Sequence, residues 1–291
     1  MSEVQNIQWF PGHMAKAERE IKKLLPLTDA VAEIVDARIP LSSRNPDLDR
    51  IVSGKPRVVI LNKCDMADDA ATAAWVKKYS EAGIAAIPTD CRTGKGINNF
   101  SPTVKRVLAD KLRGYREKGM VGKTLRVMVV GIPNVGKSTF INRIAGVGKA
   151  KSENRPGVTK GNQWYSVDKE LELLDTPGVL WPKFEDKTVG EHLAFIGSVK
   201  GEVVDTEGLA VRLCEFLKEK YPRSLYDRYG IDPETVGEGD TGIIGYELLC
   251  AIGKKRGFVV RGGEIDEART AVMLLDEFKN CKLGKITIEK V

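Results

Sequence analysis

The sequence predicts an α/β fold in which helices cover a doubly wound, mostly parallel sheet, followed by a small all-helical domain. Helical and strand-like segments alternate along the chain as far as Asp175, and no strand-like pattern follows it. The length of 291 residues suits two domains, because a single core commonly holds about 100–200 residues. We therefore expect a larger α/β domain followed by a smaller helical one.

The larger domain is predicted from apolar residues that recur at helical spacing in some segments and as short continuous runs in others. The predicted helices are residues 14–25, 68–82 and 97–118, and the predicted strands are residues 30–35, 57–61, 84–88, 124–130 and 171–174. Continuously apolar strands are typical of a parallel sheet that is buried on both faces. The alternation therefore indicates a parallel sheet with helices packed on it.

The smaller domain is predicted from helical spacing of apolar residues near the C-terminus. The predicted helices are residues 209–217, 245–252 and 268–278. We expect residues 1–185 to form the α/β domain, residues 186–204 to be a linker or connecting helix, and residues 205–291 to form the helical domain.

The composition is that of a globular protein, because 42% hydrophobic and 30% charged residues exclude disordered and collagen-like chains. The net charge of +6 suits a nucleic-acid partner without requiring one. The five cysteines are scattered without a C-x-x-C pair and only two histidines are present, which argues against a disulfide framework and a structural zinc site. We see no signal peptide or membrane span, and we expect a cytoplasmic protein.

A phosphate-binding motif lies between a predicted strand and an apolar helix. Residues 131–138 read G-I-P-N-V-G-K-S and match G-x-x-x-x-G-K-[ST] in the structural context that this pattern needs. Backbone N–H groups of such a loop surround phosphates, Lys137 reaches the β and γ phosphates, and the Ser138 hydroxyl can bind Mg²⁺. The alternative is a glycine-rich turn that binds nothing. The expected phosphate contacts are Asn134, Val135, Gly136, Lys137, Ser138 and Thr139.

A second phosphate element follows the predicted strand 171–174, where the sequence reads D-T-P-G. Asp175 at the end of that strand can hold Mg²⁺, and the Gly178 N–H can reach the γ-phosphate. Thr159, in the loop between the two motifs, can complete the Mg²⁺ ligands. The alternatives are a common turn for D-x-x-G and an exposed hydroxyl for Thr159.

A base-recognition motif, N-K-C-D, ends the predicted strand 57–61. The Asp65 carboxylate can accept two hydrogen bonds from the N1–H and N2–H₂ edge of guanine, whereas adenine offers no matching pair of donors. The nucleotide is therefore predicted to be GTP, bound at the base by Asn62, Lys63 and Asp65. The alternative is that these residues only cap the following helix. A later turn, Asp90-Cys91-Arg92, can support the base with backbone N–H groups.

Together these motifs resemble the translation-factor class of GTPases, but in a rearranged order. In ordinary members the phosphate loop comes first and N-K-x-D follows D-x-x-G, whereas here N-K-C-D precedes the phosphate loop. A doubly wound sheet tolerates such a rearrangement, because the old termini can be joined while new ones open in a loop. We therefore expect a circularly permuted P-loop GTPase domain.

With W-F-P-G-H-M at Trp9–Met14 and D-A-R-I-P at Asp36–Pro40, the whole chain resembles the bacterial ribosome biogenesis GTPase A family, also called YlqF. The resemblance implies a GTP-driven factor in late assembly of the large (50S) ribosomal subunit, with an RNA-binding helical domain similar to ANTAR domains. One departure is Asp90-Cys91-Arg92, which stands where S-A-K is usual. The alternative function is a GTP-sensing module that binds RNA or the ribosome, or an RNA chaperone, in which hydrolysis is incidental.

The residue that orients the attacking water is not apparent from the motifs. Many small GTPases carry glutamine directly after D-x-x-G, where this chain has Val179, so turnover without a stimulating partner should be on the order of 10⁻⁴ to 10⁻² s⁻¹. The resemblance implicates His13 in catalysis, although a helix-capping or packing role is the alternative. It also matches Asn134 to an asparagine that potassium-activated GTPases use to hold K⁺, whereas a polar loop residue is the alternative. The expected catalytic residues are His13, Asn134 and Lys137, and the expected cofactors are Mg²⁺ and K⁺.

Two basic clusters are candidates for RNA contact. Residues 105–126 carry eight basic and two acidic side chains, which equals the net charge of the whole chain. The expected RNA-binding residues of the helical domain are Lys254, Lys255, Arg256 and Arg261. A solvated charged face is the alternative for either cluster. Because residues 205–291 hold 14 basic and 16 acidic residues, any RNA contact there must depend on a local patch. We expect a monomer that binds GTP or GDP and the large subunit with its rRNA, and no membrane.

Overall fold

The computed structural model describes residues 11–52, 54–120, 122–146, 163–176, 178, 186–199, 205–235 and 243–291, without the side chains of residues 11–15 and 17. The described residues divide into two compact units. The α/β unit consists of residues within Gln8–Lys183 together with the tail Thr287–Val291, and the helical unit consists of residues within Phe184–Ile286.

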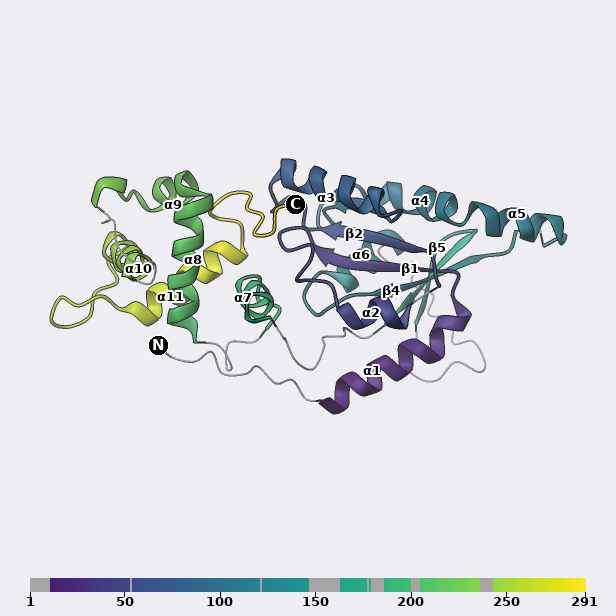
Figure 1. The fold of residues 1–291 in the computed structure, drawn as a ribbon, viewed down its shortest axis with the longest axis horizontal. Coiled ribbons are helices and arrows are strands. Elements are labelled where there is room, and N and C mark those ends of the chain that lie inside the picture. Colours follow the sequence, from purple (N-terminus) through teal and green to yellow (C-terminus); the bar gives the residue numbers. More distant parts are fainter. Residues whose placement is uncertain are drawn as a thin grey trace. The chain divides into compact units, whose positions relative to one another are not determined.

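The α/β unit contains a six-stranded sheet in the order β3-β2-β1-β4-β6-β5. Figure 1 labels β1, β2, β4 and β5 of this sheet. The strands are β1 (Ala30–Asp36), β2 (Arg57–Asn62), β3 (Ala85–Thr89), β4 (Leu125–Val130), β5 (Trp164–Asp168) and β6 (Leu171–Asp175). All neighbouring pairs are parallel except β5 and β6. The chain moves outward from β1 to β3 and then returns to place β4 on the other side of β1. Ligands of such sheets bind at the carboxyl ends of the strands near this reversal.

Helices connect the strands and cover the sheet. They are α1 (Pro11–Leu24), α2 (Pro46–Ile51), α3 (Asp69–Glu81), α4 (Phe100–Val107), α5 (Ala109–Glu117) and α6 (Lys137–Ala145). The side chains of Asn45 and Asp68 cap the first turns of α2 and α3 by accepting hydrogen bonds from backbone N–H groups.

The predicted helix 97–118 is divided in the structure. A short 3-10 turn (Ile97–Asn99) precedes α4, and Leu108, with φ −102° and ψ 18°, separates α4 from α5. Hydrogen bonds nevertheless cross the break, because Leu108 N–H donates to the Val104 carbonyl and Leu112 N–H donates to the Leu108 carbonyl. The break is therefore a local distortion, and the two helices lie end to end (Figure 1).

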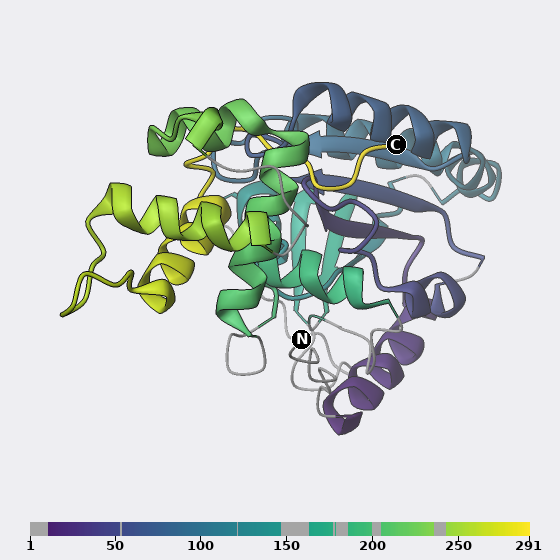
Figure 2. The ribbon, with the colours of Figure 1, turned by 60° about the vertical axis from the view of Figure 1, so that its left-hand side comes forward.

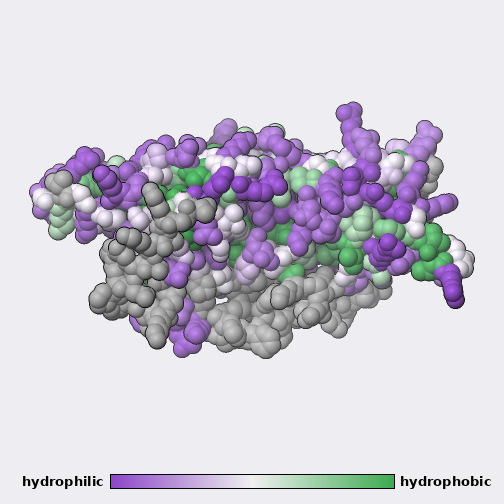
Figure 3. Space-filling model, turned by 180° about the vertical axis from the view of Figure 1, so that it is seen from behind, coloured by the Kyte–Doolittle hydropathy of each residue, from purple (hydrophilic) through white to green (hydrophobic). Residues whose placement is uncertain are grey.

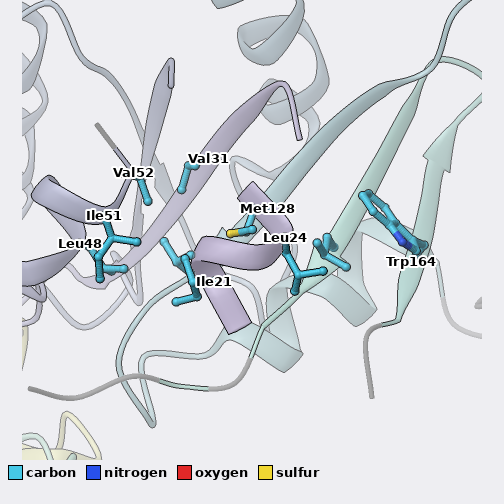
Figure 4. Close-up of a cluster of buried hydrophobic side chains, with 10 residues drawn as sticks. Ile21, Leu24, Val31, Leu48, Ile51, Val52, Met128 and Trp164 are labelled. Carbon is cyan, nitrogen blue, oxygen red and sulfur yellow. The ribbon is translucent and has the colours of Figure 1, made fainter. Parts of the chain in front are cut away.

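Two hydrophobic clusters fix helices to the sheet. One cluster packs α1 and α2 against β1, β4, β5 and β6 (Figure 4); it contains Ile21, Leu24, Val31, Leu48, Ile51, Val52, Met128, Val130, Trp164 and Leu174. The other packs α3 against β1 and β2; it contains Val35, Ala37, Val59, Leu61, Cys64, Ala67, Trp75 and Tyr79. Val31 and Val35 are four residues apart on one strand and therefore lie on the same face. Helices α1, α2 and α3 thus share one face of the sheet.

The helical unit is built around α8, which contacts the other helices of the unit. Its helices are α7 (Lys187–Phe195), α8 (Thr206–Lys220), α9 (Pro222–Tyr229), α10 (Ile243–Arg256) and α11 (Glu267–Lys279), drawn in green to yellow in Figure 2. Apolar side chains of α8, including Leu209, Leu213 and Leu217, are almost fully buried. Helices α8, α10 and α11 correspond to the three predicted segments, whereas α9 was not predicted.

The division between the units differs from the expected boundaries at two places. Helix α7 belongs to the helical unit: the ring centres of Phe195 and Phe278 lie 6.1 Å apart, and Glu191 pairs with Arg212 at 2.7 Å. Residues 187–195 therefore form a helix that packs within the helical unit. The tail Thr287–Val291 belongs to the α/β unit, where Ile288 N–H donates to the carbonyl of Arg38 at 2.8 Å.

The face of the described chain seen from behind is mostly hydrophilic, with smaller hydrophobic patches between (Figure 3). Among the described residues, no helix has the length and apolar character needed to cross a bilayer.

Candidate nucleotide-binding site

Four loops that carry predicted site residues follow parallel strands of the sheet. They are residues 63–65 after β2, 90–95 after β3, 131–136 after β4, and the described residues 176 and 178 after β6, and Asn62 and Asp175 are the last residues of β2 and β6. Since the carboxyl ends of parallel strands meet at one edge, these loops lie at the same edge of the α/β unit. β4 borders the reversal in strand order, so the phosphate motif occupies the position where such sheets bind ligands.

The phosphate loop contains residues with positive φ, a conformation that glycine adopts readily. Asn134 and Gly136 adopt left-handed conformations, with φ of 65° and 97°. A Cβ atom at Gly136 would lie 2.3 Å from the side-chain nitrogen of Asn62, so only glycine leaves room for the base motif. Helix α6 then begins at Lys137, and its N-cap residue, Gly136, has no side chain that could bond to the first N–H groups. Its first N–H groups therefore remain available to an anion such as phosphate.

The structure brings Lys137, Asp175 and Gly178 close together. A Cβ atom built on Gly178 would lie 3.1 Å from Lys137 Nζ. Burial lowers the pKa of the Lys137 ammonium, and the Asp175 carboxylate opposes that shift. Burial likewise raises the pKa of Asp175, against the effects of Lys137 and of the Thr176 N–H. The site thus holds a half-buried carboxylate whose negative charge is incompletely compensated.

The base motif is bonded directly to the phosphate loop. The Asn62 side chain donates to the carbonyl of Val135 at 2.7 Å, and Lys63 Nζ donates to the carbonyl of Asn134 at 2.8 Å. The Asn62 side-chain oxygen also accepts a hydrogen bond from the Cys91 N–H at 3.3 Å. Asn62 therefore connects the loops that follow β2, β3 and β4.

The turn after β3 is held by its own side chains. Asp90 accepts hydrogen bonds from the Arg92 N–H at 2.8 Å and from the Thr93 hydroxyl at 2.6 Å. Burial raises the pKa of Asp90, but these hydrogen bonds outweigh it and the resulting pKa is lowered. With the Cys91 and Arg92 N–H groups bonded to Asn62 and Asp90, the turn supports the base motif through Asn62.

Asp65 lies at the solvent-facing side of the site. Its carboxylate is 3.3 Å from the Arg92 guanidinium, and the two side chains are 23% and 76% exposed. Exposed pairs of this kind contribute about 0–1 kcal/mol. The carboxylate can therefore exchange this partner for the donor edge of a base.

Arg143 of α6 also contributes to the site, although the sequence pattern did not indicate it. Its guanidinium donates a hydrogen bond to the carbonyl of Thr93 and lies against Gly94, where a Cβ atom would be 2.9 Å from Arg143 Nε. This contact joins α6 to the turn after β3. No spacing rule reveals it, because Arg143 reads as an ordinary basic residue in the last turn of a helix.

The side chains of His13, Thr159 and Val179 lie outside the described part of the structure. His13 is in the first turn of α1, but its side chain is not described. Thr159 and Val179 fall in undescribed segments.

The four basic residues predicted to bind RNA have different surroundings in the helical unit. Lys254 and Lys255 are exposed at the end of α10, and Arg261 is exposed in the loop where Val259 pairs with Ile265. Arg256 instead pairs with Glu277 of α11 at 3.1 Å and lies over the Tyr229 ring at 5.3 Å. Arg256 thus connects elements of the unit.

Comparisons with known proteins identify the family and the fold of this chain. The family model described as 50S ribosome-binding GTPase matches residues 126–223, so the match starts in β4 and leaves the N-K-C-D motif before it. Two solved structures match over 94% of the chain: GDP-bound TM YlqF, with a TM-score of 0.64, and GNP-bound YlqF from T. maritima, with a TM-score of 0.63. Both are 27% identical and are covered over 99% and 98% of their own lengths. The predicted fold class, a circularly permuted P-loop GTPase followed by a helical domain, is confirmed.

Curated relatives match almost the whole chain. Ribosome biogenesis GTPase A of Bacillus cereus is 46% identical, with 97% of this chain and 93% of the relative covered. The protein of the same name from Priestia megaterium is 47% identical, with coverages of 97% and 96%, and that from Thermotoga maritima is 32% identical, with coverages of 98% and 94%. The chain matches these relatives over nearly its full length, and its phosphate and base motifs lie at one edge of a permuted sheet. The chain therefore belongs to the ribosome biogenesis GTPase A family.

Proposed function

We propose that this GTPase binds the pre-ribosomal particle, promotes a late step in assembly of the large (50S) ribosomal subunit, and couples GTP hydrolysis to its release. The observation that carries the proposal is the bonded set of nucleotide loops in a chain whose full-length relatives are named for ribosome biogenesis. The alternative, a GTP-sensing binding module with incidental hydrolysis, is not favoured. We propose that the protein acts as a monomer in the cytoplasm.

The nucleotide is GTP before hydrolysis and GDP after it. Asp65 accepts the N–H donors of guanine, while Asn62, Lys63 and the turn Asp90–Arg92 fix the base-binding loop. The phosphates are bound by backbone N–H groups of Asn134–Thr139, by the Lys137 ammonium and by the Gly178 N–H. The support for this assignment is that the base and phosphate loops are hydrogen-bonded to each other.

Mg²⁺ is the expected metal, with the Ser138 hydroxyl, Asp175 and Thr159 as its protein ligands. The donor set fits, because hard oxygen donors suit Mg²⁺ and Asp175 is an incompletely compensated carboxylate beside the phosphate loop. Within the described residues, no cluster of three or more His, Cys, Asp or Glu side chains could hold a metal by itself, so further ligands come from the phosphates and water. When bound, Mg²⁺ neutralises charge that develops on the phosphates.

Hydrolysis depends on three further features of the chain. Lys137 stabilises negative charge on the phosphates, Asn134 contributes an amide oxygen to a K⁺ site, and His13 positions the attacking water. Two observations support this role of Asn134. The residue is exposed in the phosphate loop, and its backbone carbonyl accepts a hydrogen bond from Lys63 Nζ. A cation at that point would stabilise the transition state as an arginine finger does.

The helical unit binds rRNA through Lys254, Lys255 and Arg261, which are exposed at one end of α10 and in the following loop. Arg256 supports this surface by holding α10 to Glu277. Arg269 lies over the Phe258 ring at 4.1 Å and adds a further cation to the same loop. Ammonium and guanidinium groups bind phosphate oxygens without requiring a particular base sequence.

The test is GTP turnover measured with the protein alone, with large subunits and with small subunits as the matched control. Stimulation by about 10³-fold or more with large subunits alone, a gain typical of assisted GTPases, is the expected result. Equal turnover in all three samples would contradict the proposal. Co-sedimentation with large subunits should also be stronger with a nonhydrolysable GTP analogue than with GDP.

A further inference from the structure

A buried ion pair between Asp36 and Arg38 contacts the base motif. The Asp36 carboxylate, at the end of β1, is 0% exposed, and Arg38 is 2% exposed. Arg38 donates to both carboxylate oxygens, through Nε and Nη2, each at 2.9 Å. The backbone N–H of Arg38 donates to the same carboxylate at 3.1 Å. This arrangement holds the carboxylate in one orientation.

The surrounding loop leaves Asp36 little freedom to move. The Ser43 hydroxyl accepts a hydrogen bond from the Asp36 N–H at 3.0 Å and donates one to the carbonyl of Ile39 at 2.6 Å. The Ala37 N–H donates to the carbonyl of Asn62 at 2.8 Å, which fixes this loop to the base motif. The carboxylate therefore has a fixed position relative to Asn62 and to its neighbour Lys63.

Lys63 links this buried pair to the phosphate loop. Its Nζ lies 3.0 Å from Asp36 Oδ2 and donates to the Asn134 carbonyl at 2.8 Å. The Lys63 backbone is left-handed, with φ of 60°, a conformation that is uncommon for a residue other than glycine. One ammonium group thus connects a buried carboxylate with the loop that holds the phosphates.

The carboxylate remains charged although burial opposes its ionisation. Burial raises the pKa of Asp36, but the charges of Arg38 and Lys63 and their hydrogen bonds outweigh it, and the pKa is well below its usual range. A charged, immobile acceptor attracts the Lys63 ammonium more strongly than a neutral one.

We propose that Asp36, oriented by Arg38, is a positioning residue of the nucleotide site, which fixes the Lys63 ammonium and through it the phosphate loop. The inference rests on the proposed nucleotide site and adds to it a residue that touches neither base nor phosphate. Its effect on nucleotide binding passes through Lys63.

The test is a double-mutant cycle on GDP affinity, measured by titration with fluorescent GDP, with Asp36→Asn, Lys63→Met and both together. Asp36→Asn should raise Kd about tenfold when Lys63 is present and less than about twofold when Lys63 is already methionine. Two independent sites would give the same factor in both backgrounds, and that result would overturn the inference.

Glu33 supplies the matched control. It is a buried carboxylate on the same strand, 2% exposed, and pairs with Arg44 and Arg57 at 3.2 Å each, away from the nucleotide loops. Glu33→Gln should lower stability toward urea and change the Kd for GDP less than about twofold. A comparable loss of affinity in Glu33→Gln would mean that Asp36 acts only through general stability.

The outcomes separate this inference from the proposed site. If Lys63→Met leaves the Kd unchanged, both the proposed role of Lys63 and the positioning role of Asp36 are wrong. If Lys63→Met weakens GDP binding and Asp36→Asn does not, only the positioning role is wrong. If the Asp36→Asn protein does not fold, a protein with both Asp36→Asn and Arg38→Gln takes its place in the cycle, because this pair of substitutions removes both buried charges.

Discussion

The side-chain amide of Asn62 donates a 2.7 Å hydrogen bond to the carbonyl of Val135, across 73 positions of the chain. Because the amide oxygen of Asn62 also accepts from the Cys91 N–H, a single side chain sets the spacing of the loops that follow β2, β3 and β4. Covalent bonds limit the distance between guanine and the phosphates in GTP, so the loops must keep a compatible spacing.

Asn62→Ala should weaken GDP and GTP binding by about tenfold and lower the free energy of unfolding by about 1–3 kcal/mol, since it leaves buried polar groups without their partner. Fluorescent nucleotide titration and urea unfolding check these two effects. Asn142→Ala, on an exposed position of α6, is the matched control and should leave both quantities unchanged within about 0.5 kcal/mol. Wild-type affinity in Asn62→Ala would show that the loops hold their spacing without this residue.

Asp65→Asn should shift nucleotide preference from guanine toward xanthine, because an amide offers a donor where the carboxylate offered only acceptors. Competition between GTP and XTP for the fluorescent nucleotide measures the shift. Arg92→Ala, which removes the exposed partner of Asp65, should leave base preference unchanged. An Asp65→Asn protein that still prefers GTP would rule out Asp65 as the guanine acceptor.

Turnover should be faster in KCl than in NaCl at equal ionic strength, because a K⁺ near the phosphates stabilises charge in the transition state. Asn134→Gly should abolish this difference, since glycine adopts the left-handed φ of 65° at this position but has no amide oxygen. Phosphate release in the two salts is the measurement, and GDP affinity is the control for an intact site. Equal rates of the unchanged protein in the two salts would argue against a K⁺ site.

His13→Ala should lower subunit-stimulated kcat by about 10²-fold or more while leaving GDP affinity unchanged, as expected for a group that acts on the attacking water. Single-turnover hydrolysis on saturating subunits measures it, and a subunit-binding assay shows that the complex still forms. An unchanged kcat would remove His13 from the mechanism.

Lys254→Glu with Lys255→Glu should weaken subunit binding and flatten its dependence on salt by about one unit of slope per lost phosphate contact. Co-sedimentation between low and moderate salt measures the slope. Arg256→Ala is the informative comparison, because it should lower stability by leaving Glu277 with one cation fewer and should change the slope less. A salt slope that stays the same in the double variant would locate the RNA contact elsewhere.

The phosphate loop, the D-T-P-G turn and the N-K-C-D motif were predictable because each follows a short strand with apolar residues and has a fixed spacing of residue types. Strand β5 was missed because only Trp164 among its five residues is buried, which leaves no apolar run to recognise. Helices α2 and α9, of six and eight residues, are too short to establish a helical period. The position of Asp36 opposite Lys63 depends on the pairing of β1 with β2, which a local pattern does not contain.

The basic segment 105–126 illustrates a further limit of sequence reasoning. Four of its eight cations are paired with acidic residues, three of them with acids outside the segment. The pairs are Lys105 with Glu170, Lys111 with Asp29, Arg113 with Asp110, and Arg126 with Glu172. The formal charge of a segment therefore overstates its attraction for RNA, because partners distant in sequence neutralise much of it.

The docked tail Thr287–Val291 makes the helical unit an insertion in the α/β unit instead of a C-terminal appendage. The Trp75 indole donates to the Glu289 carbonyl at 2.7 Å, and the Asp68 N–H donates to the Thr287 hydroxyl at 3.0 Å. A unit tethered at both ends loses orientational freedom compared with one on a single linker, and the second attachment acts at high effective concentration. A single cut in the connection that enters the helical unit would thus leave two fragments that remain associated through the tail. Release of the tail would leave the helical unit attached to the α/β unit by one connection only.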